Sequence, residues 1–361
     1  MSKFPMIRVS IIGTVGVPSC YGGFESLVDN LLDYTPDGVQ YTVFCSGLQY
    51  EQRLETYKGA RLVYLDREAN GVSSILYDYE SMRRSLDCDV MLILGVSGCL
   101  FLPRIRRRFK GRIITNIDGL EWKRDKWKWY AKALLRWSER QAVRYSDTVI
   151  GDNKGITDYI KTAYGTDAVL IPYGGDHAER TEDDALLALY PFAHTKYAAT
   201  VCRIEPENNI HIILEAFAAY ENFPLVIVGN WENSAYGRAL KETYSQCANI
   251  NLLDPIYDLH RINWLRSHAA VYVHGHSAGG TNPSLVEAMC LGLPVLAFDC
   301  VYNRATTENR CLYWKTTAKL AALLTEQESV FPQIARDMQD VGTRLYRWEH
   351  IAGQYNALLQ Q

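Results

Sequence analysis

Continuous apolar stretches alternate with stretches of amphipathic, helical spacing along the whole chain. The apolar stretches are rich in Val, Ile and Leu, a pattern typical of parallel strands that are buried on both faces. This alternation predicts an α/β fold made of two doubly wound domains, each with a parallel sheet. The first series of predicted strands comprises residues 8–13, 41–47, 60–66, 89–95, 111–117 and 147–153. The second comprises residues 196–204, 223–230, 250–256, 269–276 and 293–299, with helices at 210–220, 258–267 and 282–291.

A Pro-Tyr-Gly-Gly segment at residues 172–175 separates the two series and is expected to act as a hinge. We therefore place the first domain at residues 1–172 and the second at 173–343, and we expect a last amphipathic helix within residues 347–361. Open parallel sheets bind ligands beyond the carboxyl ends of their strands. A cleft between the two domains is thus the expected site.

Composition narrows the class of protein. The 361 residues are 48% hydrophobic and 22% charged, as in soluble globular proteins, and the net charge of −3 gives no sign of nucleic-acid binding. The nine Cys form no C-x-x-C pair and no Cys/His ligand spacing, which indicates reduced thiols. The N-terminus lacks the pattern of a signal peptide, and no apolar run reaches the roughly 18 residues of a membrane span. We expect a cytoplasmic protein.

The segment HGHSAGGTNPSLVEAM, residues 274–289, concentrates small and polar residues between a predicted strand and a predicted helix. Asn282 is a favoured N-cap residue, and Pro283 suits the first helical position. Gly279 and Gly280 allow positive φ angles, and free N–H groups at a helix N-terminus bind anions. Glu287, one turn inside the helix, is placed to accept hydroxyl hydrogen bonds. The segment predicts a phosphate or sugar site; a tight turn with a capped helix and a surface Glu is the alternative.

The first strand is followed by another glycine-containing loop, GTVGVPSCYGGFE at residues 13–25. It lacks the G-x-G-x-x-G pattern, and the next strand, 41–47, ends without the acidic residue that holds a ribose in nicotinamide enzymes. A dehydrogenase or a nucleotide-sugar epimerase is therefore disfavoured.

Two neighbouring segments are rich in cations and aromatic residues. Residues 103–112 hold six cations, and residues 123–140 interleave Lys and Arg with Trp and Tyr. Cations attract anionic lipid and aromatic side chains settle at headgroup depth, so we expect a membrane-surface patch. The alternative is a solvated helix face with its Trp residues in the core. The expected patch consists of Arg106, Arg107, Arg108, Lys126, Trp127 and Trp129.

Four segments together carry a family resemblance. They are residues 11–31, 116–127, 203–217 and 279–299, in the family's order and spread over nearly the whole chain. The chain resembles the retaining glycosyltransferases of family 4, which have the GT-B fold. More closely, it resembles their bacterial rhamnosyltransferase-like subfamily, whose N-terminal half carries a domain of formerly unknown function.

The resemblance implies a role for each matched residue. Arg203 corresponds to the cation that contacts the donor diphosphate, and Glu287 to the carboxylate that binds the nucleotide ribose. Many family members have a His at the position of Asp118; here Asp118 is expected to be catalytic with Arg203 by binding or orienting the acceptor hydroxyl, and an Asp that caps the following helix is the alternative. Further donor-binding residues are Gly22, Gly23, Asn208, Gly280, Thr281, Asn282, Pro283 and Ser284, and acceptor-side residues are Tyr21, Glu25 and Glu121.

Two further positions depart from the wider family. Gly279 stands where a first Glu contacts the donor sugar, and Asn208 stands where a Lys contacts the diphosphate. One cation and backbone N–H groups are then left for two phosphates. These departures leave open a catalytically silent nucleotide-sugar-binding protein.

The resemblance implies a retaining transfer of L-rhamnose from dTDP-rhamnose to a lipid-diphosphate-linked saccharide, in bacterial cell-surface polysaccharide synthesis. A UDP-hexose or UDP-N-acetylhexosamine donor is the alternative within the class. No cofactor, metal or nucleic acid is expected. The protein is expected on the inner face of the cell membrane, and its last helix, about 344–361, is expected to cross back to the N-terminal domain at Trp348.

Overall fold

The computed structural model describes residues 6–19, 22–117, 119–123, 128–220 and 222–360. Tyr21, Asp118, Lys126 and Trp127 lie outside these ranges. The chain forms two compact units, one of Met1–Tyr173 with Trp348–Gln361 and the other of Gly174–Arg347. The chain thus passes from one unit to the other at 173/174 and 347/348, beside the expected positions 172/173 and 343/344.

The first unit is built on an eight-stranded sheet with the order β3-β4-β2-β1-β5-β6-β7-β8. All neighbouring strands are parallel except β3 and β4. The pattern predicted six of these strands but missed β3 and β8, whose two residues each are too few to show a period. The strands are β1 Ile7–Ile12, β2 Val39–Ser46, β3 Thr56–Tyr57, β4 Ala60–Leu65, β5 Val90–Leu94, β6 Arg112–Ile117, β7 Thr148–Gly151 and β8 Val169–Leu170.

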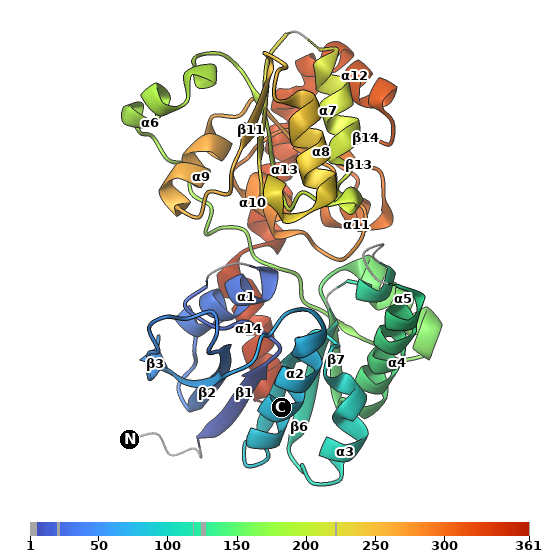
Figure 1. Cartoon of the computed structure of the whole chain (residues 1–361). Helices are drawn as coiled ribbons and strands as arrows, with labels where there is room; N and C mark the ends of the chain where they lie inside the picture. The colour runs from blue at the N-terminus through green and yellow to red at the C-terminus, as the bar shows by residue number, and fades with distance from the viewer. Residues whose placement is uncertain (1–5, 20–21, 118, 124–127, 221, 361) are drawn as a thin grey trace. The chain divides into compact units, whose positions relative to one another are not determined.

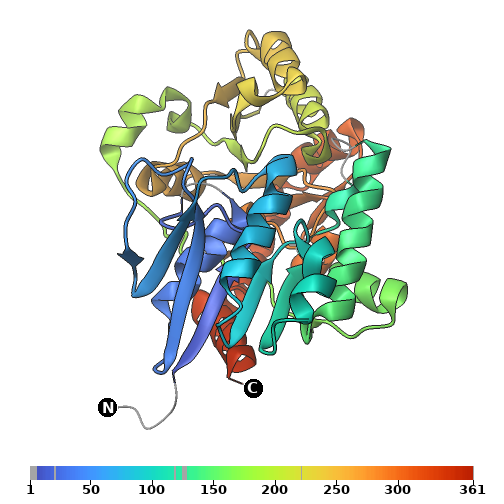
Figure 2. The same ribbon diagram turned by 60° about the horizontal axis from the view of Figure 1, so that its bottom comes forward.

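The last helix of the chain belongs to this first unit, as expected. Trp348, at its start, is buried in the same core as strands β1 and β2. Asn116 Nδ2 donates to Tyr355 Oη at 2.7 Å, and Arg112 donates to the carbonyl of Leu358 at 2.7 Å. In Figures 1 and 2 this red helix lies among the blue and cyan elements. The helices of the unit are α1 Gly23–Asp33, α2 Ser74–Arg84, α3 Leu102–Arg106, α4 Trp129–Tyr145, α5 Lys154–Tyr164 and α14 Trp348–Leu359.

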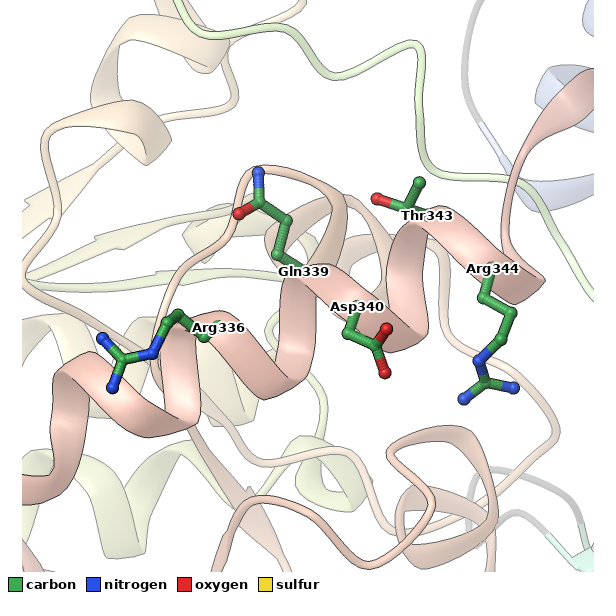
Figure 3. Close-up of a pocket in the computed structure, with 5 residues that line it drawn as sticks. All are labelled: Arg336, Gln339, Asp340, Thr343 and Arg344. Carbon is green, nitrogen blue, oxygen red and sulfur yellow. The ribbon is translucent and has the colours of Figure 1, made fainter.

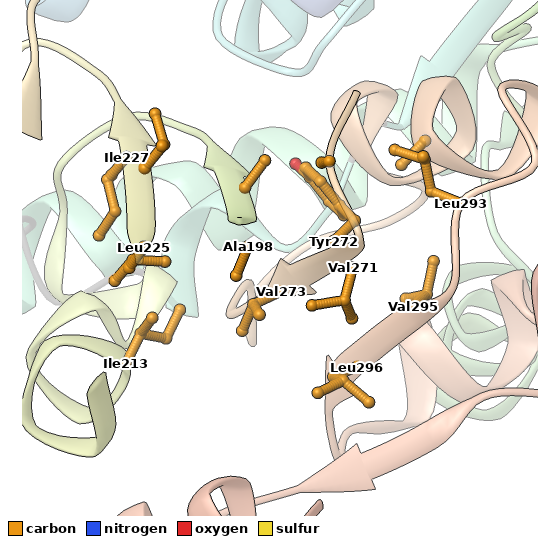
Figure 4. Packing of buried hydrophobic residues seen from close by; sticks show 14 of the residues in the cluster. Ala198, Ile213, Leu225, Ile227, Val271, Tyr272, Val273, Leu293, Val295 and Leu296 are labelled. Carbon is orange, nitrogen blue, oxygen red and sulfur yellow. The ribbon is translucent and has the colours of Figure 1, made fainter. Parts of the chain in front are cut away.

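The second unit has a six-stranded parallel sheet in the order β11-β10-β9-β12-β13-β14. Its strands supply the branched side chains that fill the core shown in Figure 4. The strands are β9 Ala198–Val201, β10 Leu225–Val228, β11 Ile250–Leu253, β12 Val271–His274, β13 Val295–Phe298 and β14 Leu312–Trp314. The helices are α6 Asp184–Leu189, α7 Ile210–Ala218, α8 Ala235–Tyr244, α9 Leu259–Ser267, α10 Pro283–Cys290, α11 Val301–Thr306, α12 Thr317–Glu326 and α13 Phe331–Leu345.

Each sheet order reverses at one place, which is where open α/β sheets bind ligands. In the first unit the reversal lies between β1 and β5, and in the second between β9 and β12. Residues 13–19 and 22 lie in the loop after β1, and the loops after β9 and β12 hold Arg203 and residues 275–282. The fold therefore brings the motifs picked out by the sequence to the ligand-binding edge of each sheet.

Two expectations drawn from composition concern the cysteine thiols and membrane-spanning helices. Cys45, Cys88, Cys99, Cys202, Cys247, Cys290, Cys300 and Cys311 are free thiols. Within the described ranges, no helix combines the length and the apolar character that crossing a bilayer requires.

Candidate functional site

The loop after β12 leads into the N-terminus of α10, as the sequence predicted. Asn282 is the N-cap residue, and its Oδ1 accepts the backbone N–H of Ser284 at 3.0 Å. Pro283 occupies the first helical position. The apolar side chains of Leu285, Val286 and Met289 are buried and fix the helix on the sheet. N–H groups of the first turn that have no intrahelical acceptor are available to an anion.

Gly279 gives this loop a backbone conformation that other residues rarely adopt. Its φ is +125°, and a Cβ atom there would lie 3.1 Å from His276 Nε2. The first Glu of the wider family would therefore be strained at this position, which gives a physical reason for the departure. Gly280 does not share the positive φ, so that expectation holds for one of the two glycines.

The Arg203 loop and the loop after β12 are joined by hydrogen bonds. Asn208 is buried; its Nδ2 donates to the carbonyl of Arg203 at 2.7 Å, and its Oδ1 lies 2.8 Å from His276 Nδ1. Ser277 donates its N–H and its hydroxyl to the carbonyl of Glu207 at 2.9 and 2.8 Å. The side chain of Arg203 is exposed. Asn208, expected to touch the donor, thus braces the turn that carries Arg203.

Glu287 is buried, which contradicts the alternative of a surface Glu. Its Oε1 lies 3.1 Å from His177 Nε2, and its Oε2 forms an ion pair with the guanidinium of Arg266. Burial alone would raise the pKa of Glu287, but the Arg266 charge and the His177 hydrogen bond lower it to about 2. The carboxylate is therefore ionised at neutral pH.

Sequence reasoning missed His177 and Arg266. Arg266 is the last cation of the helical segment 258–267, one turn after the apolar Ile262, so it falls on the face expected to be buried. A cation on a buried face requires an acidic partner, and that signal was present in the sequence. His177 directly follows the Pro-Tyr-Gly-Gly-Asp segment and carries no comparable signal.

His274, at the end of β12, is a second buried polar group here. Its Nε2 has no hydrogen-bond partner among the described residues, and its ring is stacked with that of Tyr272 and tilted against that of His276. Burial lowers the pKa of His274 to about 3, so the imidazole is neutral at ordinary pH.

In the first unit the loop after β1 folds around Glu25. This carboxylate is buried, and its Oε1 accepts Thr14 Oγ1 at 2.9 Å and the N–H of Val15 at 2.6 Å. Gly22 has a φ of +130°, and a Cβ atom there would lie 2.0 Å from Glu25 Oε2. Glu25, expected on the acceptor side, therefore holds the glycine loop in shape, and Gly23 begins α1.

The segment after β6 is anchored by a buried carboxylate. Trp122, next to Glu121 in a short 3-10 helix (Glu121–Lys123), donates its indole N–H to Glu139 at 3.1 Å. The same carboxylate accepts the hydroxyls of Tyr159 and Tyr164 at 2.7 and 2.6 Å. These bonds hold the strand end that precedes the helix α4.

The outer face of α4 is apolar and cationic. Tyr130, Ala133, Leu134 and Trp137, at the spacing i, i+3, i+4 and i+7, are all exposed, and Trp129 is 81% exposed. Arg136, Arg140 and Arg144 are exposed on the same helix, whose one acidic residue, Glu139, is buried. The alternative that Trp129 and Trp137 lie in the core is wrong.

Three consecutive arginines have different surroundings: Arg106 ends α3, and Arg107 and Arg108 follow it. Arg106 donates to the carbonyl of Gly111 at 2.7 Å and to Asp147 at 2.6 Å, so its charge is used inside the unit. Arg107 and Arg108 are exposed. Arg106 is therefore less exposed than Arg107 and Arg108.

A hollow on the surface of α13 contains none of the expected site residues. It is lined by Arg336, Gln339, Asp340, Thr343 and Arg344 (Figure 3). Arg344 pairs with Glu308, and Asp340 with Arg310. We interpret it as a paired polar surface. Within the described ranges, no group of three or more His, Cys, Asp or Glu side chains is placed to hold a metal ion.

Two family models match two separate parts of the chain. Residues 6–176 match the family model DUF1972, a domain of unknown function, and residues 191–309 match the model of glycosyl transferases group 1. No curated protein matches the chain by sequence.

Solved structures resemble the chain over almost its full length. A sucrose-phosphate synthase from Thermosynechococcus elongatus has a TM-score of 0.84 at 18% identity, over 98% of both chains. The Anabaena protein HepE, in complex with UDP, has a TM-score of 0.77 at 13% identity, over 99% of this chain and 100% of its own. A trehalose-6-phosphate synthase has a TM-score of 0.72 at 12% identity, over 98% and 99%. At these identities the likeness establishes the fold.

Proposed function

We propose that this chain transfers L-rhamnose from dTDP-rhamnose to a lipid-diphosphate-linked saccharide. Its group 1 domain and its architecture make it a glycosyltransferase with the GT-B fold. The transfer belongs to the synthesis of a bacterial cell-surface polysaccharide. The observation that carries the proposal is the junction of β9 and β12. Arg203 follows β9, and the loop after β12 leads into α10 with its buried Glu287, so all three follow the two strands at the reversal.

Each of these three groups suits a different part of a nucleotide sugar. The guanidinium of Arg203 and the N–H groups at the start of α10 match the two phosphates. Glu287 offers a charged acceptor for pentose hydroxyls, and Gly279 allows the backbone to approach the ligand closely. Asn208 contributes indirectly, since both of its polar side-chain atoms bind other protein groups.

The proposed chemistry is a front-face transfer with retention. The bond between the anomeric carbon and the leaving phosphate oxygen breaks, and the acceptor oxygen bonds to the same face of that carbon. The acceptor's proton passes to the departing phosphate. Arg203 and the N–H groups of α10 stabilise the negative charge that grows on this phosphate. Asp118, proposed to orient the acceptor hydroxyl, lies outside the described residues.

A UDP-sugar donor is the second candidate. Structures of HepE with UDP and with UDP-glucose resemble this chain, which supports a nucleotide sugar as the ligand class. A third candidate, a silent nucleotide-sugar-binding protein, follows from Gly279 and Asn208.

The acceptor and the location are proposed from the outer face of α4. Exposed Trp129, Tyr130, Leu134 and Trp137 beside Arg136, Arg140 and Arg144 match a membrane surface, where aromatic rings enter the headgroup region and cations meet anionic lipid. A surface of this kind brings the enzyme to an acceptor whose diphosphate is anchored in lipid. The protein is then peripheral on the inner face of the cell membrane.

Vesicle binding tests the membrane surface. The protein should co-sediment with anionic vesicles but not with neutral ones, and less so as salt rises, since each cation near such a surface contributes about 1 kcal/mol. Replacing both Trp129 and Trp137 with Ser should release it. Leu189→Ser with Tyr257→Ser, two exposed positions of the second unit, is the matched control. Equal binding of the Trp129/Trp137 variant and the wild type would exclude α4 as the contact.

Donor binding and turnover test the function itself. Thermal shift with dTDP-, UDP- and GDP-sugars should show the largest stabilisation for dTDP-rhamnose, because a ligand that binds only the folded state raises the melting temperature. Turnover of that donor with a lipid-linked acceptor should follow. Stabilisation without any turnover would favour the silent binding protein, and preference for a UDP-sugar would favour the second candidate.

A further inference from the structure

Two cations from different elements lie over one aromatic ring in the first unit. Lys123 Nζ is 5.5 Å from the centre of the Trp122 ring, and the guanidinium carbon of Arg136, on α4, is 5.1 Å from it. Both distances are within the range of a cation–π interaction. Within the described ranges, no other aromatic ring has two cations over it. Trp122, Lys123 and Arg136 are called the Trp122 cluster below.

The indole ring of this cluster is held in place by the protein. Trp122 Nε1 donates to one oxygen of Glu139 at 3.1 Å, and the other oxygen accepts the hydroxyls of Tyr159 and Tyr164 at 2.7 and 2.6 Å. Glu139 is buried and lies on α4, three residues after Arg136. The ring is therefore fixed by a buried group, and the two cations gather around it before any ligand binds.

The charges of the cluster have no acidic partner in the described part of the chain. Lys123 and Arg136 are both exposed, and neither forms an ion pair with a described Asp or Glu. Lys58 shows the contrast, because it lies over the ring of Tyr57 and also pairs with Asp29 at 2.7 Å. An aromatic ring offers no lone-pair acceptor, so the N–H groups of Lys123 and Arg136 stay available to an anion.

The two kinds of cation match two linked phosphates. A planar guanidinium can donate two parallel N–H bonds to one phosphate group, and an ammonium meets a second phosphate as a compact charge. Arg136 and Lys123 supply one of each. The cluster thus has the chemistry of a diphosphate site.

The surroundings of the cluster indicate what the diphosphate is attached to. Lys123 follows β6, whose carboxyl end lies at the edge of the sheet that binds ligands. Arg136 directly precedes the exposed Trp137, and Tyr130 and Leu134 continue the apolar outer face of α4. In a lipid-linked saccharide the diphosphate joins the sugar to the hydrocarbon. The cluster likewise joins the sheet edge to the apolar face, because each contributes one cation.

We propose that Lys123 and Arg136 bind the diphosphate of a lipid-linked acceptor. The inference rests on the proposed function and deepens it, since it assigns residues to the charged part of the acceptor. This site is separate from the donor diphosphate site, which is proposed at Arg203 in the second unit.

Geranyl diphosphate is a short lipid diphosphate that tests the cluster. Its dissociation constant is measured by calorimetry on the full chain, with dTDP and UDP in excess to occupy the donor site. The double variant Lys123→Gln with Arg136→Gln removes both charges and keeps long polar side chains. It should weaken binding on the order of 100-fold, about tenfold for each charged donor. Lys123→Arg with Arg136→Lys keeps both charges and should lose less than about tenfold.

Arg83→Gln with Lys319→Gln is the matched control. It also removes one Arg and one Lys, both exposed, and Arg83 likewise lies over a ring, that of Tyr79. The affinity for geranyl diphosphate should stay close to that of wild type in this control. An equal loss in the control, or no loss in the Lys123→Gln, Arg136→Gln variant, would overturn the inference, as would a wild type that does not bind geranyl diphosphate.

Geranyl monophosphate separates a diphosphate site from a surface for phospholipid headgroups. Wild type should bind it more weakly than geranyl diphosphate, and the loss in the Lys123→Gln, Arg136→Gln variant should be smaller. Equal losses for the two probes would show a general phosphate surface and overturn the inference.

Turnover distinguishes this inference from the proposed function. If wild type and the Lys123→Gln, Arg136→Gln variant had the same KM for a lipid-linked acceptor, the inference would fail and the transferase function would stand. If geranyl diphosphate bound at the cluster but no nucleotide sugar were turned over, the site would stand and the proposed function would fail.

Discussion

Asp78, on α2, is a buried carboxyl group that the proposed chemistry does not use. Its side chain is 3% exposed, and its one hydrogen bond among the described residues comes from the N–H of Gly98, 2.9 Å from Oδ2. Burial raises the pKa of Asp78 to about 8, against the small opposing effect of that hydrogen bond. The replacement Asp78→Asn keeps the shape and the acceptor for Gly98 but removes the titration.

Proton linkage gives the sign and the size of the effect that Asp78 has on the free energy of unfolding. The folded protein keeps Asp78 protonated up to about pH 8, whereas the unfolded chain loses the proton near 3.8, the ordinary pKa of an Asp side chain. Folded protein therefore binds more protons between these values, and its stability falls by about 1.4 kcal/mol per pH unit across that window. The accumulated cost is on the order of 4 kcal/mol at pH 7. It is absent below pH 4.

Thermal unfolding at several pH values measures this cost. Asp78→Asn should match wild type near pH 4 and become progressively more stable as the pH rises to 8. The exposed substitution Asp37→Asn should show no such divergence. If the melting curves of wild type and Asp78→Asn shifted in parallel at every pH, Asp78 would be ionised in the folded protein and the reasoning would be refuted.

Two further predictions concern the transfer. Arg203→Ala should lower kcat/KM roughly 30- to 1,000-fold, as removal of a charged donor to a leaving phosphate does elsewhere, while Arg336→Ala on α13 should change it little; a value for Arg203→Ala within twofold of wild type would remove the diphosphate assignment. Activity should persist in excess EDTA, because the proposed site stabilises the leaving group with Arg203 and backbone N–H groups; complete loss that Mg²⁺ or Mn²⁺ restores would contradict this.

Local pattern predicted much of the fold. Spacing predicts most strands of both sheets, the helices α7, α9 and α10, and the Asn282-Pro283 start of α10 within a few residues. Strands β3, β8 and β14 were missed because two or three residues show no period. The outer face of α4 was ambiguous, since an aromatic residue at helical spacing suits a core as well as a membrane surface, and only burial distinguishes the two.

The sequence by itself determined which residues come to the ligand-binding edges of the sheets, because strand periodicity and helix capping are local. Only the tertiary structure decided what those residues touch. Glu287 meets His177 across 110 positions of sequence, and Asn208 meets His276 across 68. The partners of a buried charge depend on which distant segments pack around it, and no spacing within one segment records that packing. Glu287 is thus a buried carboxylate and not the surface Glu of the alternative, and Asn208, expected among the donor-binding residues, hydrogen-bonds to two loops.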